Sequence, residues 1–239
     1  MNRICVLACF FAKDLFRSLA GIVPPAAALT FGIIAFEYGM DQAQFITVAG
    51  IGIGAICLLT TLLLSSRANR ASSYLLVTRL HRRSDLLVAL VLTSLGTTTA
   101  LAILIASGNL LAGRLTLDFP SVLWILPTWA PLWILAAALA LPLSALASRG
   151  GSHLLSYVLL AVLLIANDQK AMLAARGLDW LARAVTILLW PVSKLLVQAS
   201  SGIHDRSYWL AGALTLAYAA LLLAGAISLF KGKDLLWSE

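Results

Sequence analysis

The sequence predicts an all-α polytopic membrane protein with six transmembrane helices, forming a single transmembrane domain over residues 1–239. Of its residues, 61% are hydrophobic and 11% are charged, and the mean hydropathy is +0.96. A soluble globule of this size needs far more polar surface. The basic residues alternate with apolar segments that are long enough to cross a bilayer. The net charge of +7 therefore indicates topology, and no base-stacking or phosphate-cradling pattern points to nucleic acid.

Residues 1–18 predict an amphipathic helix on the inner membrane surface. The spacing of Arg3, Asp14 and Arg17 puts these three charges along one helical face. The apolar run that starts at Ile4 is similar to a secretory signal, but Lys13 and Asp14 come before any small-residue cleavage site. We therefore expect this helix to be retained.

Six apolar segments are predicted to span the membrane: residues 20–36, 45–64, 86–106, 122–147, 154–166 and 208–230. The fourth contains Pro127, Pro131 and Pro142, which predict kinks. The fifth is short for a crossing, which predicts local thinning of the bilayer or a break in the helix. Tyr208 and Trp209 are expected to anchor the outer end of the last span.

Two glycines of the second span, Gly50 and Gly54, form a small-xxx-small pair. Such a pair lets another helix approach closely. The partner is either another span of the same chain, which we favour, or a second subunit.

An external element is predicted over residues 167–199. Its first part, residues 167–183, is amphipathic and should lie at the outer interface. Its second part, residues 184–199, is too short for a confident crossing and contains Pro191 and Lys194. We expect this second part to be re-entrant, with two short helices that meet at a break near Pro191 while Lys194 reaches outward.

The loop at residues 67–85 fixes the orientation, because it carries five of the 17 basic residues. Short loops rich in Lys and Arg stay on the cytoplasmic side. With six spans, this loop and both termini are cytoplasmic, and the whole net charge of +7 falls on that side. A seven-span arrangement weakens this asymmetry. The expected location is the plasma membrane, specifically a bacterial inner membrane.

The sequence contains no GxxxxGK[ST] phosphate loop, no H-E-x-x-H and no G-x-S-x-G, so we predict no catalytic residues, cofactor or metal site in this chain. The three histidines and three cysteines lack partners with metal-ligand spacing. No Asp, Glu, Lys, Arg or His falls in the central part of a predicted span, which argues against an ion-driven transporter. The scattered acidic residues argue against a metal-dependent membrane transferase.

These features together resemble the membrane subunit of an ABC-2 type exporter. The shared features are an inner amphipathic helix, a basic inner loop between spans two and three, an external element before the last span and a basic inner tail. In that loop, 75–78 (LLVT) and Arg82 match the core of the family's coupling helix, whereas Ala71 and Leu80 depart from its usual glycine and proline. Arg149, followed by two glycines, is similar to a feature of the haem-exporter (cytochrome c maturation) B subunits.

The resemblance implies a separate ATPase that binds ATP and Mg, in two copies, and a second copy of this chain or a related permease, with lipids around them. The residues that would dock into the ATPase are Ser72, Ser73, Tyr74, Leu75, Leu76, Thr78, Arg79 and Arg82. The chain itself would be a transport subunit and not an enzyme. Since no charged side chain faces a cavity, a lipid-like, amphipathic or hydrophobic peptide cargo is favoured.

Three alternatives remain open from the sequence. The basic loop could serve only to set topology, as a solvated turn. The whole chain could be a haem-exporter-like subunit, or a non-transporting subunit that anchors or regulates an enzyme at the membrane.

Overall fold

The computed structural model describes residues 3–38, 41–69, 83–115, 119–144 and 179–231, and these residues are all-helical without strands. The elements in chain order are α1 (Arg3–Phe16), η1 (Leu19–Ile22), α2 (Val23–Tyr38), α3 (Gln42–Gln44), η2 (Phe45–Ala49), α4 (Gly50–Ala68), α6 (Arg83–Leu111), α7 (Phe119–Leu143), α10 (Asp179–Ser200) and α11 (Arg206–Lys231). The predicted all-α architecture is therefore confirmed for the described part of the chain.

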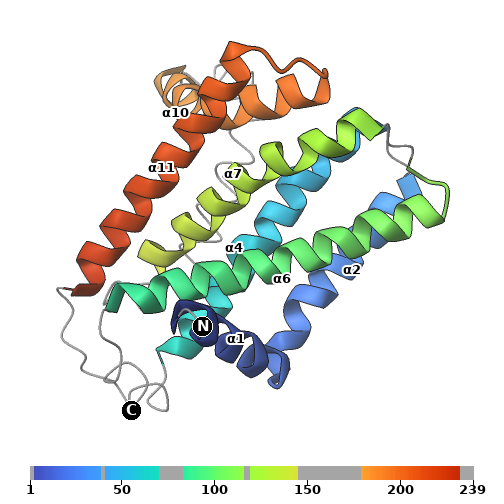
Figure 1. The fold of residues 1–239 in the computed structure, drawn as a ribbon. Helices are drawn as coiled ribbons and strands as arrows, with labels where there is room; N and C mark the ends of the chain where they lie inside the picture. The colour runs from blue at the N-terminus through green and yellow to red at the C-terminus, as the bar shows by residue number, and fades with distance from the viewer. Residues whose placement is uncertain (1–2, 39–40, 70–82, 116–118, 145–178, 232–239) are drawn as a thin grey trace.

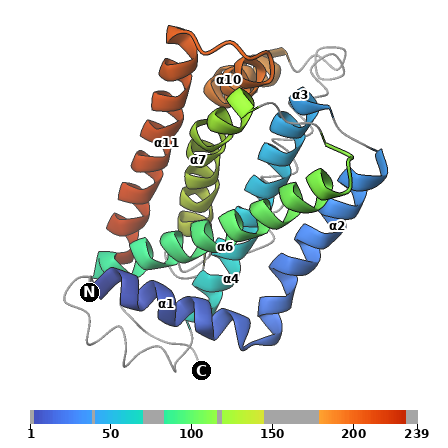
Figure 2. The same cartoon turned by 45° about the vertical axis from the view of Figure 1, so that its right-hand side comes forward.

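Five helical stretches are long and apolar enough to cross a membrane: Leu19–Glu37, Gln42–Ala68, Ser84–Leu111, Val122–Leu143 and Arg206–Phe230. They correspond to the first, second, third, fourth and sixth predicted spans. The fifth predicted span, residues 154–166, lies outside the described residues. Helix α7 ends at the opposite end of the bundle from α10 and from the start of α11 (Figures 1 and 2).

The predicted amphipathic helix corresponds to α1, which runs along one end of the bundle beside α6 (Figure 2). Leu7, Phe11 and Leu15 are spaced four residues apart and form its buried stripe. The chain then turns sharply through η1 into α2. A Cβ on Gly21 would collide with the carbonyl oxygen of Leu15, so this tight turn requires a glycine.

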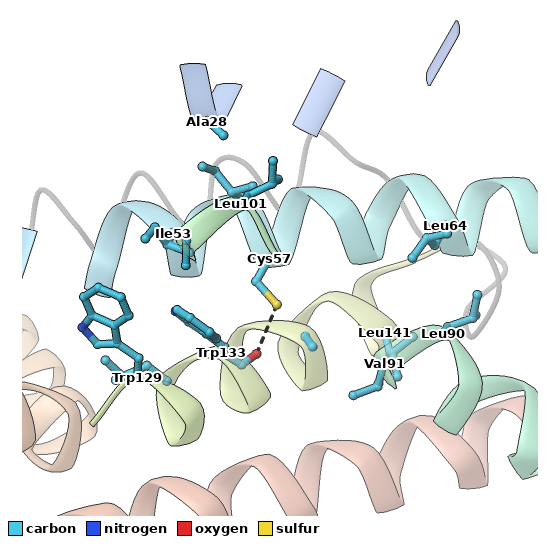
Figure 3. Close-up of a cluster of buried hydrophobic side chains, with 14 of the residues drawn as sticks. Ala28, Ile53, Cys57, Leu64, Leu90, Val91, Leu101, Trp129, Trp133 and Leu141 are labelled. Carbon is cyan, nitrogen blue, oxygen red and sulfur yellow. Dashed lines mark hydrogen bonds between the residues drawn. The ribbon is translucent and has the colours of Figure 1, made fainter. Parts of the chain in front are cut away.

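Helix α4 lies at the centre and packs against α6 and α7, and α7 also packs along α11. Figure 3 shows part of the core between them, where Ile53 and Cys57 of α4 lie beside Trp129 and Trp133 of α7. The thiol of Cys57 donates a hydrogen bond to the Trp133 carbonyl oxygen at 3.4 Å. This core has the close packing of large and small side chains that apolar helices need in a bilayer.

Helix α7 continues as one α-helix through its three interior prolines, Pro127, Pro131 and Pro142. Each proline removes one backbone donor, which membrane helices tolerate when nearby hydroxyls or neighbouring helices replace the lost interaction. Here the Thr128 hydroxyl donates to the Trp124 carbonyl oxygen at 2.7 Å, next to Pro127. This bond goes to the carbonyl next to that of Leu123, which is the one that Pro127 leaves without its usual donor, so the packing of α7 against α4 and α11 is what supports the helix there.

The helix over the second part of the predicted external element differs from the prediction. We expected two short re-entrant helices meeting near Pro191, but α10 is one continuous helix of 22 residues that contains Pro191. It lies across the end of the bundle (Figures 1 and 2). Pro191, Leu195 and Ala199 form a buried stripe along one face of α10, and their packing holds the helix together despite the lost N–H of Pro191.

Candidate functional site

The end of the bundle that carries α1 contains an ion pair between α4 and α1. Arg67, the next-to-last residue of α4, places Nη2 2.7 Å from Oδ2 of Asp14, and its Nε donates to the same oxygen at 2.8 Å. The Arg67 side chain is only 14% exposed, whereas that of Asp14 is 41% exposed. The pair is therefore partly shielded from water and fixes α1 against the end of α4.

A second contact fixes α1 to α6. The Thr93 hydroxyl of α6 lies 3.1 Å from the Ala8 carbonyl oxygen of α1 and 2.8 Å from the Ala89 carbonyl oxygen of its own helix. Leu86 and Leu90 are buried nearby in the same core as Leu7 and Phe11. The two helices that flank residues 70–82 are thus both held by α1.

The predicted ATPase-docking residues Ser72, Ser73, Tyr74, Leu75, Leu76, Thr78, Arg79 and Arg82 all lie outside the described residues. The structure therefore describes α4 and α6, the helices on either side of this predicted loop, and α1, which contacts both. The predicted role of the loop itself stays a prediction.

The predicted packing glycines lie on the face of α4 that meets α7. A Cβ on Gly50 would lie 2.8 Å from Nε1 of Trp129, whereas a Cβ on Gly54 would lie 3.8 Å from Cδ1 of Trp133, an ordinary contact. The Trp129 indole donates to the Ile46 carbonyl oxygen at 2.9 Å, within the π-helical turn η2. Gly50 thus makes room for a tryptophan that is hydrogen-bonded to the start of the span.

A third glycine in the same span was not singled out from the sequence. A Cβ on Gly52 would lie 2.5 Å from Cε2 of Phe31, so Gly52 makes room for the ring of Phe31 on α2. The spacing of Gly50 and Gly52 puts them on different faces of the helix, and each face accepts one aromatic ring. The glycine-rich start of α4 therefore serves two neighbouring helices.

An apolar groove of about 190 Å³ lies between α4, α7 and α10. Gly50, Gly54 and Leu58 form one wall, Leu132 and other α7 side chains form a second, and the α10 side chains Leu189, Val192, Ser193 and Leu196 form the third. Such a groove suits a hydrocarbon chain or an apolar side chain.

Buried hydroxyl groups form hydrogen bonds between α4 and α6 inside the bundle. The Thr61 hydroxyl donates to Ser94 Oγ at 2.7 Å, and the Ser94 hydroxyl in turn donates to the Cys57 carbonyl oxygen at 3.0 Å. Thr98 Oγ1 and Trp133 Nε1 are buried without a hydrogen-bond partner in the structure. This small polar cluster ties α4 to α6 without an ionised group in the apolar layer.

At the opposite end of the bundle, Asp205 directly precedes α11 and caps its N-terminus. Its Oδ1 accepts hydrogen bonds from the Ser207 hydroxyl at 2.8 Å and from the Tyr208 backbone N–H at 3.0 Å, which is the pattern of a helix N-cap. Gln198 Nε2, near the end of α10, donates to the same oxygen at 2.8 Å. These bonds, that from Ser207 most of all, hold the pKa of Asp205 below its ordinary value.

An aromatic cluster surrounds this cap. The rings of Trp124 and His204 stack with their centroids 3.8 Å apart, and Tyr208 meets both rings edge-on. The Tyr208 hydroxyl is 2.9 Å from Thr128 Oγ1, which links α11 to α7. The cluster therefore joins α7, α11 and the end of α10 into one unit.

The two residues that the sequence assigned to a break in the external element lie inside α10. Pro191 is buried and Lys194 is partly buried, and the helix continues through both. Among the residues that the structure describes, no group of three His, Cys, Asp or Glu side chains is placed to hold a metal ion.

Sequence reasoning missed the Asp205 cap and the Arg67–Asp14 pair. The cap has a local signal, because Asp205 lies three residues before a long apolar run that starts at Tyr208. The ion pair has none, since its partners are 53 positions apart in the chain.

Comparison with protein-family models, with curated proteins and with solved structures gave no match. The site is therefore interpreted from its own geometry. It contains an apolar interior between two ends at which an ion pair and hydrogen bonds join neighbouring helices.

Proposed function

We propose that this chain is the membrane subunit of an ATP-driven exporter of the ABC-2 type. It moves a lipid-like, amphipathic or hydrophobic peptide cargo outward across a bacterial inner membrane, and ATP is hydrolysed on a separate ATPase. The complete transporter contains two ATPase subunits and two membrane subunits, the second being another copy of this chain or a related permease. The apolar interior, with hydroxyls in place of charges, supports this class of cargo.

The observation that carries the proposal is the bracing of α4 and α6 by α1. The basic loop, residues 67–85, connects these two helices, and each of them is fixed to α1 by its own contact. A force applied to this loop by a partner would therefore move α1, α4 and α6 together instead of bending one helix. Coupling between a soluble motor and a membrane path requires a stiff unit of this kind.

The proposal includes an orientation and a sixth span. The loop and both termini are cytoplasmic and α10 is external, because this arrangement puts the whole net charge of +7 inside. Since α7 ends at one end of the bundle and α10 lies at the other, residues 154–166 are proposed to supply the missing crossing.

The orientation is tested by labelling single cysteines, introduced at Ser73 and Asp168 in a cysteine-free background, with a membrane-impermeant reagent on intact cells. We expect Asp168→Cys to be labelled and Ser73→Cys to be protected. Labelling of Ser73→Cys from outside would overturn the orientation.

The partner is tested by purifying the tagged chain from its native membranes in mild detergent and measuring ATP hydrolysis in the product. We expect an ATPase to co-purify at a fixed ratio, and its turnover to fall when 72–79 are replaced by Gly and Ser. Co-purification of another enzyme without an ATPase would favour an anchoring subunit. Metal-dependent turnover by the chain alone would indicate a membrane transferase.

A further inference from the structure

A second apolar groove runs between α2 and α6 and has a volume of about 440 Å³. Its floor contains the buried side chains of Ala28, Leu101 and Ile105, and its rims contain the exposed side chains of Leu29, Ile33 and Leu104. The α2 wall extends from Pro25 to Phe36, roughly 16 Å at the rise of an α-helix. The groove is therefore elongated along α2 and bordered by exposed apolar side chains.

A cation stands at one end of this groove. Arg114 follows the end of α6, and its guanidinium carbon lies 5.1 Å from the ring centroid of Phe36, which lines the groove. The backbone N–H of Arg114 donates to the Asn109 carbonyl oxygen at 3.0 Å, and Gly113 adopts a left-handed φ of 66° that allows this return of the chain. Within the described ranges, no carboxylate forms an ion pair with Arg114.

We propose that this groove binds one phospholipid of the surrounding bilayer, with an acyl chain along α2 and α6 and the phosphate on Arg114. The apolar walls fit hydrocarbon, and a guanidinium offers the paired donors that a phosphate accepts. An apolar helix of a second copy would match the walls equally well, but it would not supply an anionic partner for Arg114, which has none among the residues that the structure describes. The combination of groove and cation thus favours a lipid with an anionic phosphate.

The inference does not depend on the exporter proposal, because it uses only α2, α6 and the turn that follows α6. It assigns a role to the loose packing between α2 and α6: a bound acyl chain would fill the space that the side chains of the two helices leave open.

Two glycines of α6 allow a matched test. A Cβ on Gly108 meets nothing within 4 Å, and Gly108 lines the groove. A Cβ on Gly96, an α6 residue that does not line the groove, also meets nothing within 4 Å. Gly108→Leu should therefore fill the groove without displacing protein atoms, and Gly96→Leu makes the same chemical change on the same helix outside it.

The experiment measures lipid retention by native mass spectrometry of the purified, delipidated chain titrated with dioleoyl phosphatidylglycerol or with dioleoylglycerol, which has the same chains but no phosphate. We expect the chain and Gly96→Leu to retain one tightly bound phosphatidylglycerol, and Gly108→Leu to bind it at least tenfold more weakly. Arg114→Gln should bind phosphatidylglycerol at least fivefold more weakly and dioleoylglycerol as the unchanged chain does.

Three results would overturn the proposal. Equal retention by the unchanged chain and Gly108→Leu would exclude the groove. Equal affinity of the unchanged chain for the two lipids would exclude the phosphate contact at Arg114. A loss in Gly96→Leu as large as that in Gly108→Leu would show that the effect comes from α6 itself and not from the groove.

Discussion

The helical stretches that contain α4 and α2 are both long enough to cross a membrane, but they are packed very differently. Of the most apolar stretch of Gln42–Ala68, 61% is buried inside the structure, against 22% of that of Leu19–Glu37. Helix α4 meets α6, α7 and α2, whereas α2 lies at the edge of the bundle with a groove between it and α6. Hydropathy therefore identifies both spans, whereas the small residues and hydroxyls of α4 allow it to pack at the centre of the bundle against several helices.

The largest difference in stability between α4 and α2 should appear when one isoleucine of each helix is replaced by alanine. Ile53 of α4 is fully buried, and Ile34 of α2 is 49% exposed. Ile53→Ala should lower the free energy of unfolding in detergent by about 3 kcal/mol, because it leaves a cavity at the centre of the bundle. Ile34→Ala should cost about 1 kcal/mol or less, since lipid or detergent fills the space. Equal losses in both variants would contradict the contrast between the two helices.

Alanine substitutions at the two predicted packing glycines should differ in their effect on the free energy of unfolding, by less than the two isoleucine substitutions do. Gly50→Ala should lower the free energy of unfolding by about 1–2 kcal/mol, because the new methyl group displaces Trp129 from its bond to Ile46. Gly54→Ala should be neutral or stabilising by up to about 1 kcal/mol, since its Cβ meets only an ordinary contact and alanine favours the helix. Near-ultraviolet circular dichroism of the tryptophans provides a second readout.

The ion pair that braces α1 should contribute less to stability. In a double-mutant cycle of Arg67→Gln and Asp14→Asn, we expect a coupling energy below about 1 kcal/mol, because Asp14 is partly exposed and screened. Arg17→Gln, at the exposed position directly after α1, is the control for a general loss of charge. A coupling energy indistinguishable from zero would show that this ion pair does not help to hold α1 against α4.

The smallest effect should be the pH dependence of the Asp205 cap. Hydrogen bonds lower the pKa of Asp205 from its ordinary 3.8, so the ionised carboxylate stabilises the start of α11 above that pH. The stabilisation should decline as the pH falls below about 3.8 through the lowered pKa. The melting temperature of Asp205→Asn should therefore lie below that of the unchanged chain at pH 6, and the gap should narrow at pH 3. A gap that does not change with pH would contradict this role.

Five of the six predicted spans correspond to long apolar helical stretches of the structure, because the transfer of apolar side chains into a bilayer is a local property. The predicted second span, residues 45–64, became the helical stretch Gln42–Ala68, which extends at both ends because helices continue into the polar interface. The amphipathic helix at residues 1–18 was predicted for the same reason, since its periodicity is local.

The sequence could not predict contacts that depend on packing. Pro191 suggested a break, but the cost of one missing donor is small beside the burial of a whole face of α10. The bond from Trp129 to Ile46 joins positions 83 apart, and nothing in the local pattern identifies it. The glycine spacing did predict a close approach in α4, but not which aromatic ring would occupy it.

The most direct test of the central claim, that a separate ATPase drives this bundle through residues 72–81, uses the reconstituted complex. Tyr74→Ala and Leu75→Ala should each weaken association with the ATPase by about 2 kcal/mol, roughly 30-fold, and reduce its stimulation, as expected for buried anchors. Ser73→Ala and a single rim substitution, Arg79→Gln, should have smaller effects. Unchanged association and unchanged ATPase stimulation in both Tyr74→Ala and Leu75→Ala would contradict the account.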